Sequence, residues 1–193
     1  MHATLEAMDP ELLQSHRMRP LSRREYDQLV ELGAFQNERI ELLRGVLVKM
    51  SPQGAPHSGI TAWFAQKLIL LTQGAYEVRS HSPYAADDYS EPEPDVSVSI
   101  RNPDAHEHPT SVLLLIEVAD SSLRIDRKVK LPIYAEAGAP EYWLVDVNAQ
   151  TVVVYTKPVD GEYSSIERFH RTGVLKPTTL PGIEIDLAQL HWT

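Results

Sequence analysis

The chain of 193 residues contains no cysteine, which excludes disulfides, thiolate nucleophiles and zinc–thiolate sites. It also lacks a long hydrophobic run: the longest apolar segment, residues 60–71, is interrupted by a glutamine and a lysine and is far shorter than a membrane span. The first residues include Glu6, Asp9 and Glu11 instead of the basic and apolar stretches of a signal peptide. We therefore expect a cytoplasmic protein without a membrane partner.

Basic residues are in deficit, because 18 Lys and Arg face 27 Asp and Glu and the formal net charge is −9. A protein that binds nucleic acid passively usually has an excess of basic residues. Any nucleic-acid partner must therefore be bound locally, where metal cations or a confined basic patch offset the acidic field.

The length suits one domain with a substantial core. No internal repeat, low-complexity tract or linker is present, so we expect an N-terminal arm over residues 1–20 and a single domain over residues 21–193. Ser22 with Glu25 three residues later is a capping-box pattern, which predicts that a helix starts there.

Apolar periodicity predicts an alternation of helices and strands, and hence an α/β fold. Two helices are expected in addition to the one after Ser22, at residues 57–74 and 126–138. Residues 39–50 resemble a hairpin around Gly45. The remaining expected strands lie at residues 76–82, 95–100, 112–118 and 141–147, with 151–156 and 162–170 completing a β-meander.

Three acidic residues occur where strands should be buried. Asp95 follows Pro94 at the start of one strand, and Glu117 lies near the end of the continuously apolar residues 112–118. Burying an unpaired carboxylate costs several kcal/mol or more, so these positions indicate a metal site or a buried ion network. Glu41, among apolar neighbours in the hairpin, is either a third member or a solvent-facing residue of an edge strand.

A lysine-bearing helix follows Glu117. Pro132 is awkward inside a helix, so we expect the helix proper to start near Lys128 to Lys130. Side chains on a helix lean toward its N-terminus, which directs an early lysine back toward Glu117, although helical geometry does not choose between Lys128 and Lys130. His57, at the entrance of the preceding helix, is either an accessory site residue or a packing or capping residue.

These residue types suit phosphodiester hydrolysis. That reaction needs an activated water, charge stabilisation at phosphorus and help for the leaving oxygen, which a carboxylate-bound divalent cation and a lysine can provide. Mg²⁺ takes one or two carboxylates and keeps several waters. Asp95 and Glu117 fit as ligands, with Glu41 as an outer or additional ligand and the backbone carbonyl of Val118 as a further candidate.

Three segments resemble the Uma2 family of the PD-(D/E)XK nuclease superfamily: P-D-V, then I-E-V-A-D-S-S-L, then D-R-K-V-K-L-P-I-Y-A-E-A-G-A-P-E-Y-W-L-V-D. Two earlier segments, R-I-E-L-L-R-G-V-L-V-K-M-S-P and P-H-S-G-I, extend the resemblance to residues 20–190. It implies a restriction-endonuclease-like core, with a mixed central β-sheet flanked by helices and here an additional β-meander. It also implies an endonuclease that uses Mg²⁺ or Mn²⁺.

Transferred by position, the family's acidic residues are Glu41, Asp95 and Glu117, and its lysine is Lys130. His57 matches a histidine often seen in the family and is an accessory candidate. Ala119 stands where the superfamily usually has the lysine, so Lys130 must act from the following helix or the site lacks its lysine.

Three hypotheses follow. The first is a metal-dependent endonuclease whose partner is nucleic acid, with DNA and a homodimer expected by analogy. The second is a non-catalytic DNA-associated or regulatory protein that keeps the nuclease fold. The third is a structural role, in which Glu117 and Lys130 form only a buried ion pair. The sequence itself does not select duplex DNA, single-stranded DNA or RNA.

Overall fold

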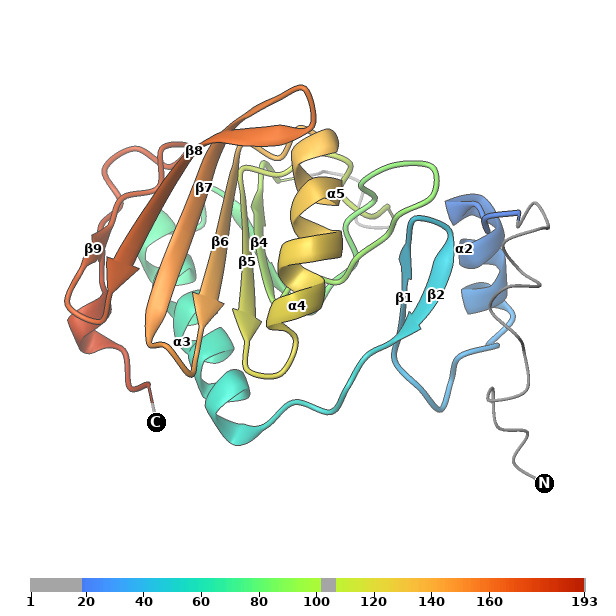
Figure 1. Cartoon of the computed structure of the whole chain (residues 1–193), viewed down its shortest axis with the longest axis horizontal. Coiled ribbons are helices and arrows are strands. Elements are labelled where there is room, and N and C mark those ends of the chain that lie inside the picture. Colours follow the sequence, from blue (N-terminus) through green and yellow to red (C-terminus); the bar gives the residue numbers. More distant parts are fainter. Residues whose placement is uncertain (1–18, 102–106, 193) are drawn as a thin grey trace.

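A six-stranded mixed β-sheet forms the centre of the protein (Figure 1), in the order β3-β4-β5-β6-β7-β8. The computed structural model describes residues 19–101 and 107–192, so the predicted arm over residues 1–20 lies almost entirely outside the described residues. Strand β5 pairs in parallel with β6, and the other neighbouring pairs are antiparallel. The strands are β3 (Glu77–Ser80), β4 (Val96–Ser99), β5 (Leu114–Ala119), β6 (Glu141–Asp146), β7 (Thr151–Val159) and β8 (Glu162–His170).

The predicted α/β class and mixed sheet are confirmed, and the predicted meander is the β6-β7-β8 half of the same sheet. Helix α3 (Ala55–Thr72) packs on one face of this sheet. The opposite face carries a continuous helical segment, made of α4 (Leu123–Ile125), the π-helical turn η2 (Asp126–Lys130) and α5 (Leu131–Glu136).

Strand β5 shows how the two faces are built. Its alternate residues Leu114, Ile116 and Val118 pack in the cluster that contains α3, whereas Leu115 and Ala119 pack in the cluster that contains α5. Side chains alternate along a strand, so Glu117 shares the α5 face with Leu115 and Ala119. Both faces are covered, which explains why the strand is almost continuously apolar.

The helical segment starts earlier than the sequence predicts. A start near Lys128 to Lys130 was expected because of Pro132, but α4 begins at Leu123. Pro132 has no N–H to continue an α-helical ladder. The chain accommodates it with the π turn, in which the N–H of Leu131 bonds to the carbonyl of Asp126 five residues back.

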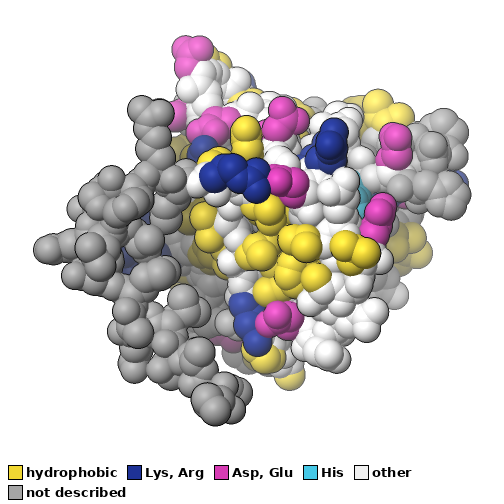
Figure 2. All heavy atoms as spheres, turned by 90° about the vertical axis from the view of Figure 1, so that its right-hand side faces the viewer, with side chains coloured by type: hydrophobic (Ala, Val, Ile, Leu, Met, Phe, Trp, Pro, Cys, Tyr) yellow, Lys and Arg dark blue, Asp and Glu magenta, His cyan; other side chains and the backbone are white. Residues whose placement is uncertain are grey.

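A smaller unit lies beside the sheet. It contains α2 (Arg23–Glu31) and the hairpin of β1 (Ile40–Leu43) and β2 (Val46–Lys49), and the predicted capping box at the start of α2 is present. Leu42 and Glu91 exchange backbone hydrogen bonds of 3.4 and 2.7 Å, which attach the hairpin to the segment before β4. Figure 2 shows apolar side chains gathered on this side of the molecule.

The last part of the chain forms short elements: β9 (Val174–Leu175), β10 (Ile185–Asp186) and the 3-10 turn η3 (Leu187–Gln189). They contribute Leu175, Ile185 and Leu187 to the α3 side of the core. Within the described ranges, no helix is both long and apolar enough to cross a bilayer.

The α3 face of the core provides a stability prediction. Phe64 is fully buried and its ring lies 6.1 Å from that of Trp143. Phe64→Ala should lower the free energy of unfolding by about 3–5 kcal/mol, because it removes buried surface and leaves a cavity. Urea unfolding measures this loss, and Ile69→Ala on the same helix, 53% exposed, should change stability by less than about 0.5 kcal/mol. Equal losses would contradict the assigned packing.

Candidate functional site

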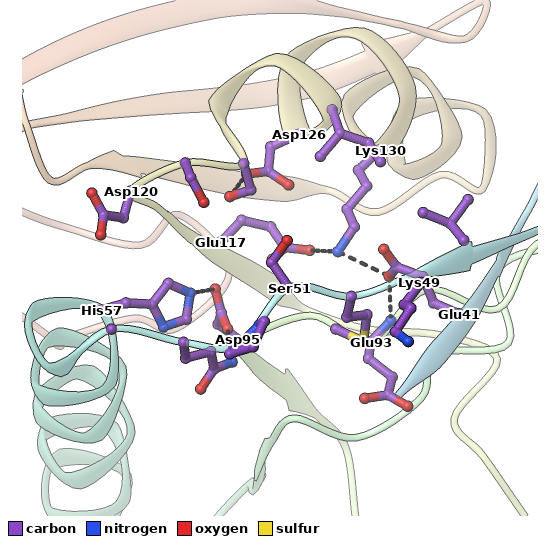
Figure 3. A pocket seen from close by; sticks show the side chains of 18 residues that line it. Glu41, Lys49, Ser51, His57, Glu93, Asp95, Glu117, Asp120, Asp126 and Lys130 are labelled. Carbon is purple, nitrogen blue, oxygen red and sulfur yellow. Dashed lines mark hydrogen bonds and ion pairs between the residues drawn. The ribbon is translucent and has the colours of Figure 1, made fainter. Parts of the chain in front are cut away.

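A cavity of about 250 Å³ opens between the hairpin, the start of α3 and the ends of β4 and β5 (Figure 3). It brings together residues that are far apart in the sequence. All five predicted side chains line it: Glu41, His57, Asp95, Glu117 and Lys130. The solvent-facing alternative for Glu41 is wrong, because this residue is only 3% exposed.

Strand pairing places two of the acids side by side. Strands β4 and β5 run antiparallel with Val96 opposite Ile116. Asp95 therefore lies next to Glu117, at the same end of this strand pair. The backbone N–H of Val118 donates to Asp95 Oδ2 at 2.8 Å. Pro94 lies directly before this position, where its missing donor interrupts no ladder bond.

Lys130 bridges Glu117 and Glu41. Its Nζ lies 3.0 Å from Glu117 Oε1 and 3.0 Å from Glu41 Oε2, and all three side chains are about 95% buried. Asp126 and Lys130 are four residues apart, which places them on the same side of the helical segment, and both are buried there. Lys128 is exposed and does not line the cavity, so Lys130 is the lysine that reaches the carboxylates.

Two further contacts complete this network. The Tyr134 hydroxyl donates to Glu117 Oε1 at 2.6 Å, and the backbone N–H of Glu93 donates to Glu41 Oε2 at 3.2 Å. Asp126, only 2% exposed, accepts a 2.6 Å hydrogen bond from the Ser122 hydroxyl. Asp126 was not predicted from the sequence, because an acid near a helix start is usually a capping or solvated residue.

Carboxylates outnumber cations in this cavity, and the pKa values reflect that excess. Burial raises the pKa of Glu117 well above its ordinary value; Lys130 opposes this shift, and the neighbouring acids reinforce it. Burial likewise raises the pKa of Asp126 to about 6. For Lys130, burial lowers the pKa, but the attraction of Glu117 and Glu41 outweighs it, so the pKa of Lys130 is raised.

Asp95 is held by histidines instead of by a lysine. His57 Nε2 lies 3.1 Å from Asp95 Oδ2, and His81 Nδ1 lies 3.3 Å from Asp95 Oδ1. Burial alone would raise the pKa of Asp95, but hydrogen bonds from His57 and His81 outweigh it and hold the pKa well below the usual range. Gln53 Nε2 approaches both His81 Nδ1, at 3.2 Å, and Asp95 Oδ1, at 3.4 Å.

Sequence reasoning missed His81. The strand predicted over residues 76–82 ends at Ser80, and His81 adopts a left-handed backbone with φ +49°. Non-glycine residues in this region are uncommon and occur preferentially at functional sites. The available signal was Pro83 two residues later, which indicates that the strand ends before it.

The two positions after Glu117 bear on the expected lysine and the expected backbone ligand. Ala119 is buried among α5-side residues, and the ammonium of Lys130 reaches Glu117 from the helix instead. Val118 is fully buried and does not line the cavity. The predicted role of its carbonyl as a metal ligand stays a prediction.

The donor chemistry of the cavity fits a hard divalent cation, because carboxylate oxygens are the ligands that Mg²⁺ and Mn²⁺ prefer. In this structure, however, the described carboxylates are not arranged around a common point as metal ligands would be. Among the residues that the structure describes, no three His, Asp or Glu side chains are grouped to hold a metal ion. Lys130 bridges two carboxylates and two imidazoles contact the third, so holding a cation requires these side chains to rearrange.

The model of the Uma2 family, described as "Putative restriction endonuclease", matches residues 23–188. The chain belongs to the Uma2 family. No curated protein shows significant sequence similarity to it.

Solved structures support the fold of this Uma2 protein. A "putative nuclease belonging to DUF820" from Anabaena variabilis superimposes with a TM-score of 0.72 at 17% identity, over 88% of this chain and 96% of that one. At this identity the likeness establishes the fold alone. The type IIG restriction endonuclease BpuSI matches with a TM-score of 0.38 at 15% identity, over 59% of this chain and 14% of that one.

The backbone of His81 provides one prediction. His81→Gly and His81→Ala both remove the imidazole, but only glycine adopts the left-handed conformation without strain. We expect the glycine variant to be more stable than the alanine variant by about 1 kcal/mol in urea unfolding. Equal stability would show that this backbone conformation is not maintained.

The buried ammonium provides another prediction. Lys130→Ala leaves Glu41 and Glu117 buried without their cation, which should cost about 3–5 kcal/mol of unfolding free energy. The loss should grow as the pH rises, because the uncompensated carboxylates ionise. Lys128→Ala, at an exposed position two residues earlier, is the stability control and should have an effect below about 0.5 kcal/mol. A similar loss in both variants would contradict the bridging role.

Proposed function

We propose that this Uma2 protein is a metal-dependent endonuclease that hydrolyses phosphodiester bonds of nucleic acid, with DNA as the substrate and Mg²⁺ or Mn²⁺ as the cofactor. The observation that carries the proposal is the convergence of Glu41, Asp95, Glu117 and Lys130 on one open cavity. Membership of a restriction-endonuclease-like family supports it. A homodimer belongs to the same proposal by analogy with such nucleases. The expectations of one domain over residues 21–193 and of a cytoplasmic location, which come from the sequence, belong to it as well.

In this proposal Asp95 and Glu117 hold the cation, Glu41 supports them, and the carbonyl of Val118 is an additional donor. When bound, the cation supplies Lewis acidity and cancels negative charge. Lys130 has a raised pKa, so its ammonium acts as a hydrogen-bond donor and not as a base. It orients the attacking water, and His57 orients Asp95 through their 3.1 Å contact.

The charge balance favours this function over a purely structural ion pair. The Glu117–Lys130 pair of the structural hypothesis is present at 3.0 Å, but Glu41 and Asp126 add two more buried carboxyl groups around the same ammonium. Buried carboxylates beyond those that a single cation can neutralise destabilise a protein. A second cation in the cavity relieves that cost.

A non-catalytic DNA-associated or regulatory protein is the second candidate. The observation that favours it is that the described side chains group no three acidic or histidine ligands around a common point. Lys130, Tyr134 and the two histidines satisfy the carboxylates without a metal. Cleavage and metal binding are therefore measured separately in the following test.

Substitution of Glu117 tests the proposal. Wild-type protein should nick plasmid DNA with Mg²⁺ or Mn²⁺ and stop when EDTA is added, whereas Glu117→Gln should lower the rate by more than about 100-fold. The melting temperature of Glu117→Gln without metal should stay the same or rise, because the variant removes a desolvated charge whose pKa is raised. Glu162→Gln, at an exposed position on β8, is the matched control and should cleave normally.

Metal binding has its own readout in the same test. Millimolar Mg²⁺ or Mn²⁺ should raise the melting temperature of the wild-type protein by several degrees, because a ligand of the native state stabilises it by mass action. The shift should be smaller in Glu117→Gln. Cleavage that persists in EDTA would contradict metal dependence. A metal-induced shift without cleavage of DNA would favour the non-catalytic candidate.

A further inference from the structure

One helical segment beside the cavity is rich in basic residues. Residues Leu123–Lys130 read L-R-I-D-R-K-V-K and contain four of the 18 basic residues of the chain but only one acid. That acid, Asp126, is 2% exposed and lines the cavity. The outer surface of this segment therefore carries cations without carboxylates of its own, in a chain whose net charge is −9.

These cations also lack ion-pair partners elsewhere. No described carboxylate lies within ion-pair distance of Arg124, Arg127 or Lys128. The basic residues near the opposite rim of the cavity are different: Lys49 pairs with Glu38 at 3.2 Å and Arg39 pairs with Glu93 at 2.8 Å. The exposed cations of α4 and η2, Arg124 and Lys128, are thus available to bind an external partner.

The position of this surface identifies the partner. Ser122, Ile125 and Asp126, in or directly before the same segment, line the cavity, and Figure 1 shows α4 beside the end of β5, the strand that carries Glu117. Arg124 and Lys128 are exposed, one helical turn apart. Both cations are therefore on the solvent side of the segment that forms one wall of the cavity, where a long polyanion bound over the cavity would extend.

We propose that Arg124 and Lys128 bind the phosphate backbone of the nucleic acid beside the cavity. This inference rests on the proposed function. It explains how an acidic protein attracts a polyanion, since the required positive charge is local. Phosphate contacts position a nucleic acid but do not read its sequence, so loss of these cations weakens binding to all sequences alike.

Salt dependence of binding provides the test. Each lost phosphate contact reduces the slope of log K against log[salt] by about 0.9 for duplex DNA and about 0.7 for single strands. The parent is the Glu117→Gln variant, which binds without cleaving, and the probes are a labelled 20-base-pair DNA duplex and its single strand. Adding Arg124→Gln and Lys128→Gln should lower the slope by about 1.8 on duplex, which corresponds to roughly 60-fold weaker binding at 0.1 M salt if the affinities converge at 1 M.

Matched variants separate this effect from a general loss of charge. Lys157→Gln with Arg168→Gln removes two exposed cations of β7 and β8 that also lack a described carboxylate partner, and it should leave the slope unchanged. Arg124→Lys with Lys128→Arg keeps both charges and should retain the parental slope. Melting temperatures close to that of the parent show that each variant is folded.

The outcomes distinguish this surface from the proposed function. An unchanged slope in the Arg124→Gln, Lys128→Gln variant would overturn the proposal that these residues bind phosphate. An equal decrease in the Lys157→Gln, Arg168→Gln control would overturn it as well. Plasmid cleavage by wild-type protein, measured in parallel, would leave the nuclease function standing in that case. If the parent binds neither probe and the wild-type protein cleaves no plasmid, both the proposed nuclease function and the proposed phosphate-binding role of Arg124 and Lys128 are wrong.

Discussion

An excess of buried carboxylates around one ammonium is the constraint on which the rest of the structure depends. Lys130 contacts Glu41 and Glu117 at 3.0 Å each, while Asp126 and Asp95 are buried in the same cavity. Buried charge of one sign is unfavourable unless it is compensated. The protein therefore satisfies each acid with specific donors, and it keeps a surplus of negative charge that a hard cation would relieve.

Local backbone features supply those donors. Pro132 lacks the N–H that an α-helical ladder needs, and a π turn directly before it contains the buried residues Asp126 and Lys130. On the other wall of the cavity, the left-handed backbone of His81 and the first turn of α3 set two imidazoles against Asp95. The backbone of His81 is one of several left-handed positions in the described part of the chain, and it is the one in contact with a cavity carboxylate.

Charge is segregated around this cavity. Acidic side chains line its interior, whereas Arg124 and Lys128, which have no described carboxylate partner, are exposed on the helical segment that forms one wall. The opposite signs have complementary uses, because acids retain cations and exposed bases attract phosphates. A net charge of −9 is therefore compatible with a nucleic-acid partner.

The sequence alone determined the α/β class and singled out Asp95 and Glu117, because an acid in an apolar run stands out against periodicity, but it left open whether Glu41 faces solvent. It did not determine which lysine reaches Glu117 or that His81 and Asp126 join the site. Those outcomes depend on which side of the helical segment is buried, on one left-handed residue and on strand register, which arise from packing between residues distant in the chain. Hydrophobic periodicity reports which face of an element is buried, and only the tertiary structure decides what that face meets.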